Sequence, residues 1–228
     1  LADAETAFRH AYGGGFRLAP VPLDGDVDLS RPTSFRSSAD AYFRLRSAGQ
    51  PWIAAVEGDG RGLFHASTPR LLGRKLFCWG MGPGGRRWQD FLAKPGSAYI
   101  EIQGGLCRTQ AEYARMPATT TWEWLEAYGL LETDPAVTQG PAYEPACHAA
   151  AAAMVRLVPQ GWLDARLVGS AAAAAGPATD LLTAGSGWGA LERRRRAAAG
   201  EPPLCGTALD FPDATLGPAQ QPWLDLLQ

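Results

Sequence analysis

The sequence predicts a mainly β protein, in which part of an antiparallel β-sandwich precedes a C-terminal α-helical tail. Short stretches of alternating apolar and polar residues recur through residues 40–128, and this is the pattern of half-buried strands. Turn-forming residues separate the stretches, and no segment between them is long enough for a helical crossover, so antiparallel pairing is expected. After Gly129 the chain becomes rich in alanine, which favours helix.

Residues 40–47 show the alternation most clearly, because Ala41, Phe43 and Leu45 share one face of an extended chain. Further strands are predicted at residues 52–57, 62–68, 74–79, 98–104 and 119–128. The first forty residues are rich in Gly and Pro and suit extended segments and loops. Between residues 84 and 94 the alternation breaks, and a short helical turn is expected there.

Alanine-rich segments predict the helices of the tail. They lie at residues 143–157, 161–175, 178–183 and 188–199. We therefore expect two parts: residues 1–130 form the sandwich part, and residues 131–228 form a helical and irregular tail that packs on it. The four arginines at positions 193–196 are expected on a solvated helix face.

The composition argues against several classes of function. With 21 basic and 23 acidic residues and a net charge of -2, nothing attracts nucleic acid or an anionic membrane, so a small neutral ligand is expected. No apolar run approaches the roughly 18 residues of a membrane span. The chain begins at Leu1 without a visible secretory signal, so we expect a cytoplasmic protein whose N-terminus is missing.

Neither a metal nor a cofactor is expected. The glycine-rich residues 79–85 match neither the dinucleotide-binding nor the P-loop pattern. The cysteines are too widely spaced for a zinc site or a disulfide framework, and free thiols are expected. They are Cys78, Cys107, Cys147 and Cys205.

The most informative stretch runs from Tyr99 to Gln103. As a strand, it sends Ile100 and Ile102 to one face and Tyr99, Glu101 and Gln103 to the other. An aromatic ring, a carboxylate and an amide in a row are groups that bind a sugar through its C–H surface and its hydroxyls. Such a row is also typical of an ordinary solvated sheet face, so both interpretations stay open.

Other side chains are candidates for the same site. Trp79, on the preceding strand, and Trp88 are candidate stacking walls for a sugar. His65 shares a strand face with Leu63 and Ser67, and is either a structural histidine or a substrate contact. The candidate donors to sugar oxygens are Arg86, Arg87 and Arg108.

Three motifs of the β part are specific in combination. They are Gly73-Arg-Lys-Leu-Phe-Cys-Trp-Gly80, Gly84-Gly-Arg-Arg-Trp88 and Tyr99-Ile-Glu-Ile-Gln-Gly-Gly-Leu106 followed by Thr109-Gln110. Together they resemble the DUF5107 family of bacterial proteins, and residues 185–196 and 216–224 extend the similarity over essentially the whole chain. The resemblance implies a galactose-mutarotase-like β-supersandwich, whose C-terminal part would be residues 1–130. In longer relatives this fold is often joined to helical-repeat domains.

The resemblance also implies an activity. Aldose mutarotases carry a catalytic glutamate in a segment similar to Leu-Glu-Thr-Gln, which Ile100-Glu101-Ile102-Gln103 matches. In that chemistry the glutamate takes a proton from the anomeric hydroxyl while a histidine protonates the ring oxygen. The resemblance therefore makes Glu101 the catalytic base or sugar anchor, and neither His10 nor His65 can be assigned the acid role.

Two alternatives use the same face differently. A glycoside hydrolase or transferase would need a second carboxylate beside Glu101. A non-catalytic sugar-binding or scaffold module would hold a sugar without turnover. The candidates for the second carboxylate are Asp90, Glu112, Glu123 and Glu126.

Overall fold

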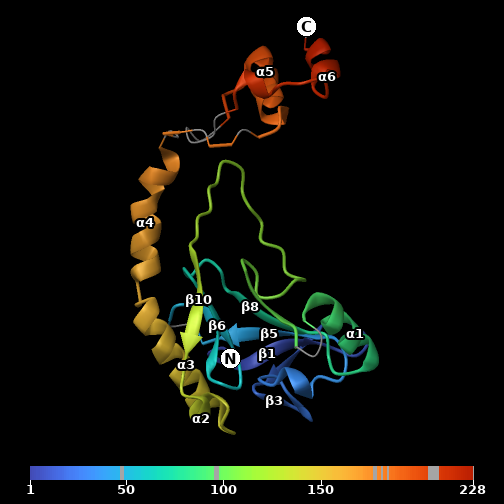
Figure 1. The fold of residues 1–228 in the computed structure, drawn as a ribbon, viewed down its shortest axis with the longest axis vertical. Helices are drawn as coiled ribbons and strands as arrows, with labels where there is room; N and C mark the ends of the chain where they lie inside the picture. Colours follow the sequence, from blue (N-terminus) through green and yellow to red (C-terminus); the bar gives the residue numbers. More distant parts are fainter. Residues whose placement is uncertain are drawn as a thin grey trace. The chain divides into compact units, whose positions relative to one another are not determined.

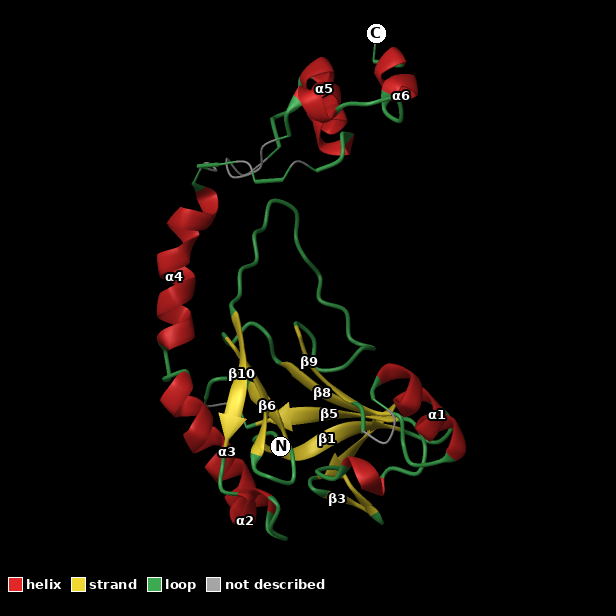
Figure 2. Cartoon of the chain, in the orientation of Figure 1, coloured by secondary structure: helices red, strands yellow, loops and turns green. Residues whose placement is uncertain are grey.

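The computed structural model divides into two compact units, Leu1–Leu167 and Val168–Gln228. The structure describes residues 1–46, 49–94, 98–176, 179–180, 182–183, 185–204 and 211–227. The described strands all lie in the first unit and pair antiparallel, and most helices follow them in the sequence (Figures 1 and 2). The mainly β fold class with a helical C-terminal part is confirmed, and the mutarotase-like supersandwich stays a prediction.

The larger sheet has five strands. In spatial order they are β2 (Phe16–Pro20), β1 (Ala4–His10), β5 (Ala39–Leu45), β8 (Gly73–Cys78) and β9 (Ile100–Gly105). A separate two-stranded hairpin, β3 (Leu23–Asp24) and β4 (Val27–Asp28), lies between β2 and β5 in the sequence. The strands predicted at residues 40–47, 74–79 and 98–104 are confirmed as β5, β8 and β9.

The smaller sheet has three strands. In spatial order they are β10 (Glu126–Glu132), β7 (Arg61–Ser67) and β6 (Trp52–Val56). The strands predicted at residues 52–57 and 62–68 are confirmed as β6 and β7. The tight turn that joins them needs Gly60, whose φ of +85° is in the region that favours glycine.

Helices cover one face of the smaller sheet. α3 (Tyr143–Leu157) buries a row of small and apolar side chains with helical spacing, including Ala146, Ala150 and Met154. These residues pack against Trp52 and Phe64 of the sheet. Figure 1 shows α3 running beside β10. The other helices of this region are α1 (Pro83–Leu92), α2 (Pro135–Thr138) and α4 (Trp162–Ala175), and α4 contains the boundary between the two units.

A second apolar core joins the two sheets. Ile53 points away from the α3 side of β6 and packs with the five-stranded sheet, where Phe43 and Leu76 are buried. Ile100 and Ile102 of β9 pack against the same cluster. The smaller sheet therefore lies between the helix and the larger sheet, with apolar contacts on both of its faces.

The second unit contains α5 (Trp188–Ala199), the short 3₁₀ helix η2 (Asp213–Thr215) and α6 (Gln221–Asp225). The four arginines of α5 form ion pairs inside this unit. Arg193 and Arg194 both contact Asp213, whereas the next two arginines contact Glu192. These arginines lower the pKa of Asp213 and that of Glu192 to about 2. The positive run is thus neutralised locally.

Three predicted features differ from the structure. The strand predicted at residues 119–128 begins only at Glu126, because its partner β7 ends at Ser67, just before Pro69. The predicted division after residue 130 falls inside β10, and the division between compact units follows Leu167 because α3 packs on the sheet. Residues 179–180 and 182–183 are not helical, and the rest of the helix predicted at residues 178–183 is outside the described residues.

We expect Ile53→Ala to lower the free energy of unfolding by about 2 to 5 kcal/mol, because a cavity would open between the two sheets. Leu63→Ala, on the neighbouring strand β7 where Leu63 is exposed, should cost about 1 kcal/mol or less. Urea denaturation followed by tryptophan fluorescence measures both values. Equal costs for the two substitutions would contradict the packing of the sheets through Ile53.

Candidate functional site

The candidate site lies on the side of the larger sheet that faces away from the core, which we call the outer face. Leu76 of β8 and Ile100 and Ile102 of β9 point into the core. Successive residues of a strand point to opposite sides, so Lys75, Phe77 and Glu101 point to the outer face. The prediction that Glu101 projects away from the core is therefore confirmed.

Two rows of directly opposed residues cross β5, β8 and β9 on this face. In the first row, Phe77 lies between Asp40 and Glu101. In the second row, Lys75 lies between Tyr42 and Gln103. Cβ atoms of directly opposed residues are about 4.5 to 5.5 Å apart, so the six side chains form one compact group, the outer-face cluster.

Charged and polar groups of the cluster are already paired. Gln103 Nε2 donates to Glu101 Oε2 at 2.8 Å. Lys75 Nζ lies 2.8 Å from Asp40 Oδ1, and these two side chains are only 12% and 16% exposed. The same ammonium lies 5.6 Å and 5.5 Å from the ring centroids of Tyr42 and Phe77, within cation–π range. Asp40 and the two rings therefore surround the Lys75 ammonium on the β5 side of the cluster.

Tyr42 contributes a phenol that stays protonated. Its hydroxyl donates to Gln110 Oε1 at 3.1 Å, so the segment after β9 folds back toward β5. Burial of the ring and the nearby charge of Asp40 raise the pKa of Tyr42 to about 12. The phenol is thus a neutral donor and acceptor at the edge of the cluster.

An aromatic wall that includes Trp79 and Trp88 adjoins the cluster. The Trp79 ring lies edge-on to Phe77, with centroids 4.9 Å apart. Trp88 of α1 stacks on Trp79 at 5.0 Å and remains 48% exposed. Phe91 meets Trp88 edge-on. These contacts give the outer face an exposed apolar surface of the kind that sugars use.

Four other residues that were predicted to contact a sugar lie outside the outer-face cluster. Tyr99 immediately precedes β9, and its backbone N–H donates to Gln89 of α1. Arg86 donates through Nε to the Met81 carbonyl, and Arg87 is exposed on α1. Arg108 follows the opposite end of β9 and lines a separate pocket. Tyr99 and the α1 arginines therefore lie toward the aromatic-wall end, whereas Arg108 does not.

His65 lies on the other sheet, and the structure does not bring it to Glu101. Its ring is buried and faces Gly104, on the core side of β9. Nε2 lies 2.9 Å from Glu126 Oε2, and the ring stacks on Tyr128 with centroids 4.5 Å apart. Nδ1 has no hydrogen-bond partner in the described part of the chain. This geometry agrees with the structural alternative for His65.

Arg74 is buried in the same region as His65. Its guanidinium is fully buried and donates to the carbonyls of Leu71, Gly73 and Pro51 and to Ser67 Oγ. Burial lowers the pKa of Arg74 to about 10. Arg74 thus ties β8 to both ends of the segment that forms the β6–β7 hairpin, and its charge disfavours protonation of His65.

The four carboxylates proposed to assist Glu101 are dispersed. Glu126 contacts His65, and Glu112 accepts a hydrogen bond from the Arg108 backbone. Asp90 and Glu123 are exposed on α1 and in the loop before β10. The carboxylate that shares a row with Glu101 is Asp40.

Sequence reasoning missed four members of the cluster, which are Asp40, Tyr42, Lys75 and Phe77. They belong to strands that were correctly predicted, and they alternate with buried Ala41, Phe43 and Leu76. Alternation alone shows that they face outward. The missing information was that β5 pairs with β8, since a complete hairpin of the other sheet separates these strands in the sequence.

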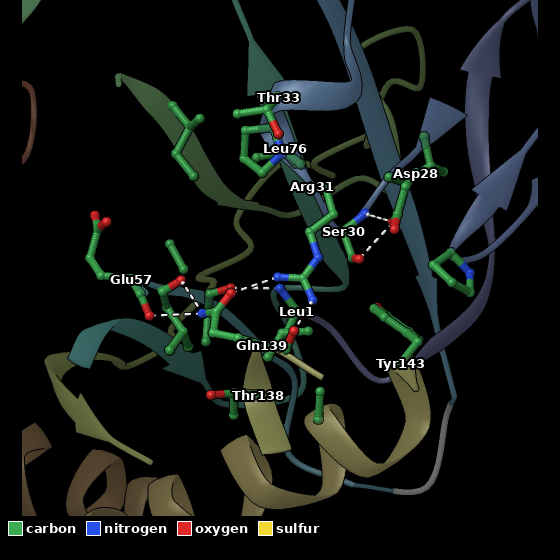
Figure 3. A pocket seen from close by; sticks show the side chains of 18 of the residues that line it. Leu1, Asp28, Ser30, Arg31, Thr33, Glu57, Leu76, Thr138, Gln139 and Tyr143 are labelled. Atoms are coloured by element: carbon green, nitrogen blue, oxygen red, sulfur yellow. Dashed lines mark hydrogen bonds between the residues drawn. The ribbon is translucent and has the colours of Figure 1, made fainter. Parts of the chain in front are cut away.

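A cavity of about 290 Å³ lies on the opposite side of β9, where Ile100 and Ile102 line it (Figure 3). In its wall Arg31 and Gln139 point toward one another, and Arg31 donates to the Gln139 side chain and to the Gln139 and Gly140 carbonyls. Gln139 in turn donates to the Glu57 carbonyl. This network fastens the segment between α2 and α3 to the end of β6.

Searches of family models, curated proteins and solved structures found no match to the chain. The resemblance to the DUF5107 family accordingly stays a prediction. In the described ranges, no group of three or more His, Cys, Asp or Glu side chains is arranged to hold a metal ion. None of the helices in those ranges has the length and apolar character of a membrane span.

We expect stability to fall as the pH drops from about 6.5 to 4. Burial, followed by the charge of Arg74, lowers the pKa of His65 from 6.5 to about 4. The unfolded chain therefore binds this proton at a higher pH than the folded chain does. Stabilisation is complete above about pH 6.5, and on the order of 3 kcal/mol is lost as the pH falls to 4.

Urea denaturation between pH 7 and pH 5 measures this dependence before most carboxylates titrate. His65→Gln should flatten the curve in this range, whereas His148→Gln, at an exposed position of α3, should leave it unchanged. Identical slopes for the wild type and His65→Gln would show that His65 is not the group responsible.

Proposed function

We propose that the outer face binds a carbohydrate and that Glu101 acts on it as a base or anchor, as in an aldose-epimerase type of protein. One observation carries the proposal: Glu101 and Gln103 lie side by side on the outer face, and an aromatic wall begins at Phe77, directly opposite Glu101. The wall continues through Trp79 and Trp88.

The chemistry of the cluster suits a sugar. A pyranose presents an apolar C–H face and a rim of hydroxyls, which match an aromatic surface beside carboxylate, amide and ammonium groups. Aromatic rings supply contact area with little conformational freedom to lose. A neutral ligand also fits a chain whose net charge is only -2. The free thiols of Cys78, Cys107 and Cys147 fit the cytoplasmic location that belongs to this proposal.

Anomer exchange is the simplest reaction for such a site. The Oε2 atom of Glu101 accepts the Gln103 amide, which holds the carboxylate in place and leaves Oε1 to face a ligand. A carboxylate at this position would take the proton of an anomeric hydroxyl. Binding without turnover uses the same contacts, and the experiment below separates the two possibilities.

We expect Glu101→Gln to slow anomer exchange by at least about 100-fold, because the amide cannot accept the proton. Sugar affinity should change by about tenfold or less, since the amide replaces one hydrogen-bond acceptor of similar shape. Exchange is measured by NMR magnetisation transfer on a panel of free aldohexoses and aldopentoses, and affinity by titration of protein spectra.

Glu132→Gln, which removes a carboxylate at the end of β10, is the matched control and should leave both quantities unchanged. If the wild type binds sugars but does not accelerate exchange, the site binds without turnover and the epimerase part of the proposal fails. If no sugar shifts the signals of the outer face, the carbohydrate proposal itself is wrong.

We expect Trp88→Ala to weaken sugar binding roughly tenfold, because the ring that covers Trp79 on the exposed end of the wall would be lost. Trp223→Ala removes a similarly exposed indole from the second unit and should not alter affinity. Both dissociation constants are obtained by calorimetric titration. Unaltered affinity in Trp88→Ala would remove the aromatic wall from the binding site.

A further inference from the structure

We propose that Lys75 is the general acid of the outer-face cluster and donates a proton to the ring oxygen of an aldose whose anomeric hydroxyl faces Glu101. This inference rests on the proposed function and assigns the proton donor that the sequence left unassigned. Three observations support it: the placement of Lys75, the contacts of its ammonium, and the positions of the other proton-bearing groups.

Placement comes from the register of β8 and β9. Lys75 lies opposite Gln103, and Glu101 is the next residue of β9 on the same face. Such diagonal neighbours have Cβ atoms about 7 to 8 Å apart or slightly less. The anomeric oxygen and the ring oxygen of an aldopyranose are bonded to the same carbon. The ammonium itself lies beside Asp40 of β5, and Phe77 separates Asp40 from Glu101 in the same row. A sugar ring that lies over Phe77 can therefore contact the carboxylate with the first oxygen and the ammonium with the second.

The surroundings of the ammonium hold it within the cluster. Asp40 lies 2.8 Å from Nζ, and this ion pair is largely shielded from water. The rings of Tyr42 and Phe77 lie within cation–π range of the same atom. An ammonium has three N–H donors. In the described part of the chain Lys75 Nζ forms an ion pair but no hydrogen bond, so N–H donors remain for a ligand above the cluster.

Other proton-bearing side chains are less well placed. His10 Nε2 lies 3.4 Å from the other oxygen of Asp40, but His10 belongs to β1, three strands from β9, whereas Lys75 belongs to β8, directly beside β9. Three strand spacings amount to about 14 Å. His65 is on the core side of β9. The Tyr42 hydroxyl is directed to Gln110. Lys75 is thus the nearest charged proton donor to Glu101 in the described cluster.

The step balances in protons and electrons. Glu101 accepts the proton of the anomeric hydroxyl, the C1–O5 bond breaks, and its electron pair takes the proton from the Lys75 ammonium. The products are the open-chain aldehyde, a protonated Glu101 and a neutral Lys75 amine. Rotation about C1–C2 and the reverse transfers close the ring as the other anomer and restore both side chains.

Two substitutions of Lys75 test the assignment by NMR anomer exchange on the same panel of free aldoses. Lys75→Met should lower the exchange rate by roughly 100-fold or more. Lys75→Arg keeps a cation for Asp40, but a guanidinium does not release its proton near neutral pH. This variant should therefore retain sugar binding while exchange stays low. Arg61→Met, which removes the cation of a surface ion pair on β7, is the matched control and should retain the wild-type rate.

Comparison of the two Lys75 variants gives a readout that a purely structural role would not change. If Lys75 acted only as a cation for Asp40, Lys75→Arg should restore both sugar binding and exchange, whereas a proton donor predicts restored binding without exchange. Wild-type rates in both folded Lys75 variants would overturn the assignment while leaving the proposed function intact. If the wild type itself shows no exchange, the proposed reaction fails and the assignment fails with it.

Discussion

Alternation of side chains along β8 and β9 places the apolar core on one face of the larger sheet and the candidate site on the other. Leu76, Ile100 and Ile102 are held by the apolar contacts between the sheets. A slip of one residue would exchange the faces of the whole strand. The burial of these apolar side chains therefore determines where Glu101 and Lys75 project, and the two rows of the outer-face cluster depend on the same register.

Local patterns were sufficient for much of the fold. The strands from β5 to β9 and the helix α3 follow from alternation and from alanine content, and these are properties of neighbouring residues. The composition of the site was harder to predict, because Asp40 and Lys75 meet only through the pairing of β5 with β8. The chain leaves this sheet after β5, forms the β6–β7 hairpin in the other sheet, and then returns. No local pattern encodes that return.

One misassigned strand and the surroundings of His65 show the limits of alternation in physical terms. Residues 119–125 alternate, but none of the described strands pairs with them, since β7 ends just before Pro69. Leu125 instead exchanges hydrogen bonds with Thr68, and Trp124 reaches Glu126 through its indole N–H. His65 contacts the carboxylate of Glu126, which belongs to a strand distant in the sequence. Contacts of this kind depend on tertiary structure, which the pattern along a single segment does not contain.

The contact between Gly104 and His65 links β9, the strand that carries Glu101, to the other sheet. A Cβ atom at Gly104 would lie 2.3 Å from Cε1 of His65 and 3.3 Å from a guanidinium nitrogen of Arg74. Only a hydrogen atom fits there, although the backbone conformation itself would accept other residues. Any side chain at position 104 would therefore require a smaller residue than histidine at position 65, so the steric limit at one position sets the residue size that the other can tolerate.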